Sequence, residues 1–178
     1  MKQVLIETIP FSVSKKQLHE GLKAPSGNPI VEGILATAEV KNGNGRYYPK
    51  ELWEREIDKY QQVVKENRST GELDHPDDLK INLDRVSHMI EKMWMDGPAG
   101  FGKLKILPTP MGELVKTMLT SGVKLGVSSR GSGNVDDRTG HVSDFEIVTV
   151  DVVAQPSAPN AYPTAIYEGL LNMKGGQK

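Results

Sequence analysis

Hydrophobic residues recur at helical spacing in two segments of the chain. Residues 50–66 place apolar side chains on one helical face and charged side chains elsewhere, the apolar face comprising Trp53, Ile57, Tyr60 and Val64. Pro49 precedes them, at a position where a helix does not need the amide hydrogen that proline lacks. A second stripe follows Thr109-Pro110, stops before Gly122 and comprises Met111, Leu114, Val115, Met118 and Leu119. Both patterns predict amphipathic helices that pack one face against a core.

Alternation of apolar and polar residues predicts strands in much of the remaining chain. The expected strands cover 3–7, 29–40, 87–97, 100–107 and 141–154. The second strand is expected to bulge at Gly33, and the third and fourth form a hairpin. Residues 42–45 predict a turn, and the polar stretch 71–84, which contains Pro76, is expected to be a loop.

The order of these elements indicates the fold class. Strands, a helix, a hairpin, a helix and further strands favour an α+β fold over a doubly wound one. We expect a small β-barrel or a curved, mostly antiparallel sheet wrapped by a few helices. The 178 residues suit a single domain, which we place at 1–163, with a loop or mobile stretch at 13–28. Residues 164–178 are expected to form a C-terminal helix or tail.

Composition narrows the possible partners and chemistry. Twenty-two Lys and Arg stand against 23 Asp and Glu, so no overall positive field attracts nucleic acid or an anionic membrane. The chain has no cysteine, which excludes disulfides, thiol nucleophiles and cysteine metal sites. Neither a signal peptide nor a stretch of about 18 apolar residues is visible. The expectation is a soluble intracellular protein without nucleic-acid or membrane partners.

The stretch GVSSRGSG, residues 126–133, combines adjacent serines with an arginine and three glycines. It permits a flexible surface loop, a phosphate cradle or the seat of a nucleophile. A phosphate cradle must open a helix, whereas a predicted strand follows here, so an anion-binding module is disfavoured. A nucleophile needs a nearby base, a group that orients the base, and amide donors for an oxyanion. In that interpretation one of the two adjacent serines attacks, and an amide of Ser129, Arg130 or Gly131 serves as donor.

Candidates for the base and the orienting group lie elsewhere in the chain. Pro76 restricts the backbone of His75 to extended conformations, although the surrounding aspartates also suit a surface turn. Those aspartates with His75 could form a metal site, but the ligand spacing is not that of a known motif, and we predict no metal and no cofactor. Asp151 interrupts an apolar strand, where a charge needs a partner. Strict alternation places it on one face with Phe145, Ile147, Thr149 and Val153. Its partner is either a histidine or the backbone.

Several motifs together resemble one family. They are LIET near the start, EGI-x-x-x-AEV at 32–40, N-x-N-x-R-x-YP at 42–49, GEL-x-HP at 71–76, GVSSRG-x-G at 126–133 and VD-x-V-x-x-PSAP at 150–159. In order and over nearly the whole chain, they resemble the prohead core protein serine proteases of T-even-type bacteriophages. The resemblance implies that His75 is the general base and Ser128 the nucleophile, with Asp151 orienting the histidine. Ser129 is the rival to Ser128, and Asp74 stands where a family member has Asn.

The resemblance also implies substrates and a location. The chain order His, Ser, Asp matches procapsid proteases of the herpesvirus assemblin kind. Such an enzyme cleaves scaffold, core and capsid proteins after Glu in (Leu/Ile)-x-Glu sequences, inside the phage prohead within the host cytoplasm. Similar tripeptides in this chain predict self-processing after Glu168 and after Glu20, while those ending at Glu7 and Glu32 lie in expected strands.

Some functional questions stay open at the level of the sequence. Arg130 is either the cation that binds a substrate glutamate or a salt-bridged loop arginine. Self-association is possible. The alternative function is an inactive structural or scaffold component of the phage head that shares the fold.

Overall fold

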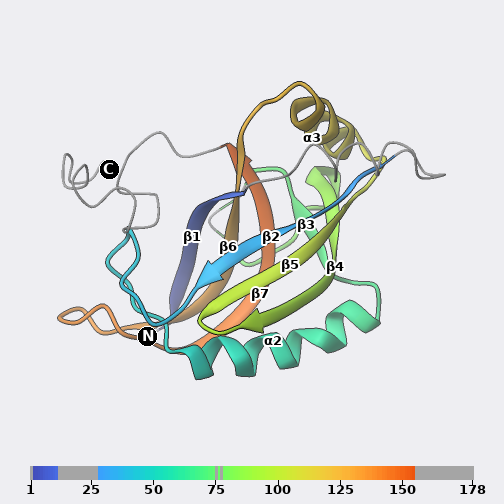
Figure 1. The fold of residues 1–178 in the computed structure, drawn as a ribbon. Helices are drawn as coiled ribbons and strands as arrows, with labels where there is room; N and C mark the ends of the chain where they lie inside the picture. Colours follow the sequence, from blue (N-terminus) through green and yellow to red (C-terminus); the bar gives the residue numbers. More distant parts are fainter. Residues whose placement is uncertain (1, 12–27, 75, 77, 155–178) are drawn as a thin grey trace.

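The computed structural model describes residues 2–11, 28–74, 76 and 78–154, and these form an α+β fold with two antiparallel sheets (Figure 1). The three-stranded sheet has the order β1-β6-β7, with bounds Gln3–Phe11 (β1), Leu125–Val135 (β6) and Val142–Ala154 (β7). The four-stranded sheet has the order β2-β5-β4-β3, with bounds Ile30–Thr37 (β2), Ala99–Ile106 (β5), Val86–Asp96 (β4) and Thr70–Glu72 (β3). The described strands do not close into a barrel, so the curved-sheet form of the prediction is the one that holds.

The two sheets share one hydrophobic core. Leu5, Val127, Val150 and Val152 come from the three-stranded sheet, and Ile90, Leu104 and Ile106 from the other. Helix α2 (Lys50–Lys65) and helix α3 (Pro110–Thr120) lie on opposite sides of the molecule in Figure 1. A 3-10 turn, Leu83–Arg85, precedes β4. No helix among the described residues is long and apolar enough to cross a bilayer.

The two helices predicted from periodicity are confirmed, whereas the expected C-terminal helix or tail at 164–178 lies outside the described residues. Pro49 is the N-cap residue of α2, and Trp53, Ile57 and Tyr60 are buried on its inner face, whereas Val64 is only partly buried. Thr109 caps α3, where its Oγ1 accepts a hydrogen bond of 2.9 Å from the amide of Gly112. The hairpin is also confirmed, as β4 and β5 pair from His88 and Ile106 to Asp96 and Ala99.

Two details of the predicted strands are wrong. The irregularity in β2 lies between Ile34 and Ala36, not at Gly33. Gly33 instead leaves room for a ring, because a Cβ there would lie 2.8 Å from Cε1 of Phe11. The stretch 71–84 is not entirely a loop, since Gly71 and Glu72 belong to β3, which pairs with β4.

The turn at residues 42–45 is confirmed, and hydrogen bonds attach it and the residues after it to β1. The carboxylate of Glu7, in β1, accepts hydrogen bonds from Asn42, Asn44, Arg46 and Tyr48. The N-x-N-x-R-x-YP motif therefore ties the turn to β1 through one carboxylate. Glu7 and Glu32 both lie in strands, as expected, and the tripeptides that they end are held in ladders that resist proteolysis.

Candidate active site

The stretch GVSSRGSG lies in β6, the central strand of its sheet, so the alternative of a flexible surface loop is wrong. Strand β6 pairs with β1 on one side and β7 on the other, and residues 125–133 are all buried. Its glycines permit close packing rather than mobility. A Cβ at Gly131 would lie 2.3 Å from the carbonyl oxygen of Glu146 and 2.7 Å from Cε1 of Phe145.

Ser128 occupies the middle of this sheet. It lies opposite Thr8 of β1 and opposite Asp151 of β7. Directly opposed residues in antiparallel strands project to the same face, so Ser128 and Asp151 share a face. Ser128 is fully buried, and its Oγ lies 3.3 Å from Oγ1 of Thr8. Ser129 projects to the other face, as neighbours in a strand do.

A bulge in β7 corrects the predicted face of Asp151. Arg130 pairs with Thr149, but Gly131 pairs with Ile147, so Val148 is an extra residue in β7. Strict alternation fails there, because one additional residue reverses the phase of the strand. Phe145 packs in the core with Val150 and Val152, whereas Thr149 and Asp151 face the side of Ser128 and Arg130.

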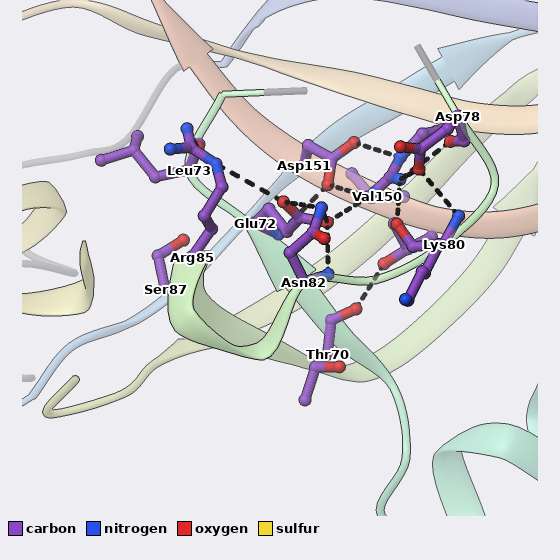
Figure 2. A network of polar contacts seen from close by, with 12 residues as sticks. Thr70, Glu72, Leu73, Asp78, Lys80, Asn82, Arg85, Ser87, Val150 and Asp151 are labelled. Atoms are coloured by element: carbon purple, nitrogen blue, oxygen red, sulfur yellow. Dashed lines mark hydrogen bonds and ion pairs between the residues drawn. The ribbon is translucent and has the colours of Figure 1, made fainter. Parts of the chain in front are cut away.

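Arg130 donates hydrogen bonds throughout a buried polar network, whose acceptor residues Glu72, Asp78, Lys80 and Asp151 are labelled in Figure 2. Its Nε donates to Oδ2 of Asp151 at 3.0 Å, and its Nη2 donates to Oδ1 of Asp151 at 3.0 Å and to Oε2 of Glu72 at 3.1 Å. Its Nη1 donates to the carbonyl oxygens of Asp78 at 3.0 Å and Lys80 at 2.9 Å. These contacts use all five N–H donors of a guanidinium.

The network decides between the two interpretations of Arg130. Its side chain is fully buried, as are those of Glu72 and Asp151. A side chain with five intramolecular acceptors has no donor left for a substrate carboxylate. The suggestion that Arg130 binds a substrate glutamate is therefore wrong, and Arg130 is a salt-bridged arginine, although on a strand rather than in a loop.

Asp151 is bonded to the guanidinium of Arg130 and to the backbone, which was one of the two partners expected for it. Besides Arg130, the amide of Glu72 donates to its Oδ1 at 3.1 Å. Among the described residues, Oδ2 accepts one hydrogen bond, from Arg130 Nε. A carboxylate oxygen has two lone pairs, so Oδ2 retains capacity for a second donor.

We call residues 73–81, between Glu72 and Asn82, the histidine segment, because they include His75. Its beginning is fixed at the junction of the two sheets, where Leu73 forms a parallel bridge with Val152 and the amide of Asp74 donates to Val152 O at 2.6 Å. Val152 adjoins Asp151, which lies opposite Ser128. His75 itself, like Glu20 and Glu168, lies outside the described residues.

Asp74 has a backbone φ of 68°, in the left-handed region. Asp and Asn adopt this region more readily than other residues with a side chain. The exchange of Asn for Asp relative to a family member is therefore compatible with the backbone at this position.

His88 is a structural histidine, as its position on a strand suggests. It is fully buried, with Nδ1 2.8 Å from Oγ of Ser87 and Nε2 2.7 Å from the carbonyl oxygen of Val150. Gly71 leaves room for the ring, since a Cβ there would lie 2.3 Å from Nε2. Burial lowers the pKa of His88 from 6.5 to about 4. The imidazole is therefore neutral in the folded protein at neutral pH.

This pKa predicts how acid destabilises the fold. In the unfolded chain His88 has its ordinary pKa of 6.5, so it is protonated below that pH, whereas in the folded state it is protonated only below its lowered pKa of about 4. The free energy of unfolding therefore falls across this window, by about 3 kcal/mol from this group. Urea unfolding at several pH values, on Ser128→Ala protein and on the Ser128→Ala/His88→Gln double variant, measures this contribution, because glutamine does not titrate. Parallel pH curves for the two proteins contradict the assignment.

Sequence reasoning missed Glu72 and the acceptors of Arg130. Glu72 lies within the GEL-x-HP motif, but nothing in the sequence assigns a role to its carboxylate, which also accepts a hydrogen bond of 3.0 Å from the amide of Asn82. An arginine amid serines and glycines requires acidic partners only when the stretch is buried, and the local sequence does not show that burial. The partners themselves lie 21 to 58 residues away along the chain.

Comparison with known proteins identifies the family. The family model described as prohead core protein serine protease matches residues 3–169. The prohead core protein protease of Enterobacteria phage T4 is 32% identical over 171 residues, which cover 90% of this chain and 78% of the relative. A solved structure of the bacteriophage T4 capsid assembly protease superimposes with a TM-score of 0.72 at 28% identity, covering 87% of this chain and 99% of that one. These matches confirm the resemblance seen in the motifs, and the chain belongs to the prohead core protein serine protease family.

Proposed function

We propose that this phage prohead protease is a serine endopeptidase in which Ser128 is the nucleophile, His75 the general base and Asp151 the group that orients the histidine. The observation that carries the proposal is the position of Ser128 on the central strand, opposite Asp151 of β7 and on the same face of the sheet. The anchoring of Asp74 at Val152, beside Asp151, supports the assignment of the adjacent residue in sequence, His75, as base.

The proposed reaction is acyl transfer. Ser128 Oγ attacks the scissile carbonyl carbon while His75 takes its proton; His75 then returns a proton to the leaving amine, and water hydrolyses the acyl-enzyme by the reverse sequence. Asp151 Oδ2 has the capacity to accept from a histidine ring nitrogen. The pairing of β6 with β7 shifts register between Arg130 and Gly131, and we assign the oxyanion donor to the amides at this irregularity.

Active-site labelling tests the nucleophile directly. A fluorophosphonate probe forms a covalent bond with an activated serine oxygen, so peptide mapping is expected to find it on Ser128. Ser129→Ala retains the label, because Ser129 projects to the opposite face. His75→Ala loses it, because the serine is no longer deprotonated by a base. A label on Ser129, or an unlabelled Ser128 in protein that cleaves substrate, contradicts the proposal.

The proposed substrates are scaffold, core and capsid proteins inside the prohead, cut after Glu in (Leu/Ile)-x-Glu sequences. Family membership supports head proteins as the substrate class. The glutamate preference stands on the family resemblance, and its cationic partner must be a group other than Arg130.

Self-processing follows from the same preference. Leu18-His19-Glu20 and Ile166-Tyr167-Glu168 have the proposed sequence and precede glycine. We expect mass spectrometry of active protein to show new ends after Glu168 and Glu20, and none after Glu7 or Glu32, whose strands are paired. The Ser128→Ala protein keeps its ends. Intact ends in a preparation that digests scaffold contradict this prediction.

A further inference from the structure

Strand β6 carries a second residue on the face of Ser128 whose contacts reach the histidine segment. Residues two apart in a strand project to the same side, so Arg130 and Ser128 share a face of β6. The arginine is fully buried and the serine beside it is the proposed nucleophile. Because the two residues lie so close on one strand, any displacement of the guanidinium would also affect the position of the proposed reacting oxygen, Ser128 Oγ.

The acceptors of Arg130 lie at both ends of the histidine segment. At the upstream end, Nη2 lies 3.1 Å from Oε2 of Glu72, and the amide of Glu72 is bonded to Asp151, itself held by Arg130. Near the downstream end, Nη1 donates to the carbonyl oxygens of Asp78 and Lys80. One side chain thus bonds the chain on both sides of His75.

Further hydrogen bonds join residues at or before the start of the histidine segment to residues that follow it. The amide of Asn82 donates to Oε2 of Glu72 at 3.0 Å, and Arg85 donates to the carbonyl oxygen of Leu73. Glu72 is the shared acceptor, because Arg130 Nη2 reaches the same oxygen. Figure 2 shows these groups converging between β3, β7 and the segment that follows β3.

The choice of arginine rather than lysine is explained by this geometry. A guanidinium presents five donors in a rigid plane, which here bind two carboxylates and two backbone carbonyls. An ammonium group offers three donors around one point, so it can neutralise a carboxylate but cannot bind Asp151, Glu72 and both carbonyls together. If the only role of residue 130 were to neutralise a buried carboxylate, a lysine would suffice and the forked donors of a guanidinium would not be needed.

We propose that Arg130 is a positioning residue for the protease reaction, fixing both ends of the histidine segment and the carboxylate of Asp151 against the strand that carries Ser128. The inference rests on the proposed function, since it acts through His75 and Asp151. Arg130 makes no contact with substrate in this role. Its effect is on the alignment of base and nucleophile.

The discriminating variant is Arg130→Lys, which keeps the buried positive charge but loses the fork. We expect a folded protein whose kcat on a peptide substrate falls about 10- to 100-fold, because a misplacement of about 1 Å is enough for such a loss. KM is expected to change by less than about threefold, because the interaction lost is not one with bound substrate. The rate of fluorophosphonate labelling of Ser128 falls with kcat.

Arg46→Lys is the matched control. Arg46, which follows the turn at residues 42–45, also forms a partly buried ion pair, with Glu7 at 2.8 Å. Its kcat is expected to stay within about twofold of the native value, whatever small stability it loses. A native kcat in Arg130→Lys overturns the inference, as does a loss of activity that matches a loss of folded protein in thermal melts.

Hydrogen exchange adds a measurement that does not depend on turnover. In the Ser128→Ala background, Arg130→Lys is expected to increase exchange in residues 72–82 while the β4–β5 hairpin keeps its protection. A uniform increase over both regions indicates general destabilisation and overturns the positioning role. If Arg130→Lys does not fold, Glu72→Gln decides the question, since it weakens the upstream contact alone; an unchanged kcat then overturns the inference.

The failure of this inference is distinguishable from the failure of the proposed function. Activity that survives in Ser128→Ala overturns the serine mechanism, and the role of Arg130 with it. Loss of activity in Ser128→Ala together with a native kcat in Arg130→Lys overturns only the role of Arg130.

Discussion

Ser128→Ala is expected to abolish cleavage of head proteins, with kcat/KM lower by a factor on the order of 10⁴ or more. Removing the nucleophile of an acyl-transfer enzyme leaves only the catalysis that binding and oxyanion contacts provide. Purified protein incubated with scaffold protein, followed by gel or mass spectrometry, measures the loss. The same variant accumulates full-length chain, because self-processing requires the same serine.

The fold of this variant is expected to be intact. Ser128 Oγ has one described contact, a long one of 3.3 Å to Thr8, so its removal costs little. Ser129→Ala, one residue along the same buried strand, serves as the matched control and is expected to retain activity. Undiminished scaffold cleavage by folded Ser128→Ala would favour another nucleophile. Absence of cleavage by the native chain under all conditions would favour the inactive head component.

Gly71→Ala is expected to be the most destabilising of the glycine substitutions near the site. A Cβ at this position would lie 2.3 Å from Nε2 of His88 and 2.3 Å from the carbonyl oxygen of Val150. Both are held, because His88 Nε2 is bonded to that carbonyl and is fully buried. Relief requires β3 to move away from β7, at a cost of about 3 kcal/mol or more, at the upper end of overpacking penalties.

Urea unfolding in the Ser128→Ala background measures this cost without self-digestion. Gly100→Ala is the matched control, since Gly100 also lies in a strand but its nearest atom, Sδ of Met95, would be 3.4 Å from the new Cβ. We expect that change to stay within about 1 kcal/mol. Equal midpoints for the two variants would show that the approach of His88 to Gly71 is looser than described.

Residues of the motif GEL-x-HP contribute both to the stability of the fold and to the proposed active site. Gly71 permits the close packing of β3 on His88, Glu72 binds Arg130, and Asp74 is bonded to Val152. A substitution at Gly71 is therefore expected to lower activity as well as stability, because it displaces the residues that precede His75. The motif therefore combines close packing with the residue that we propose as the general base.

The sequence by itself determined the local elements and the family. Periodicity located α2, α3 and the β4–β5 hairpin, because the spacing of apolar residues reports directly which face of an element is buried. Proline and threonine at the helix starts act through contacts within one turn, so the starts of the helices can also be predicted from the sequence. The motifs around His75 and Ser128 indicated the prohead protease family, which the comparisons confirm.

Only the tertiary structure decided how residues 126–133 are used. Glycine and serine suit a loop when they are solvated and a tight central strand when they are covered on both sides, and local sequence cannot distinguish the two. Strands β1 and β7 supply that cover from positions more than 100 residues before Ser128 and about 20 after it. The bulge at Val148 likewise arises from pairing between strands, and it reversed the face predicted for half of β7.

The role of Arg130 was decided in the same way. The sequence shows that a cation stands beside Ser128, but charge alone is satisfied equally by a substrate carboxylate and by an internal one. The fold brings Glu72, Asp78, Lys80 and Asp151 within hydrogen-bond distance of a single guanidinium. Burial then fixes the outcome, because a charge removed from water must find its partners inside the protein.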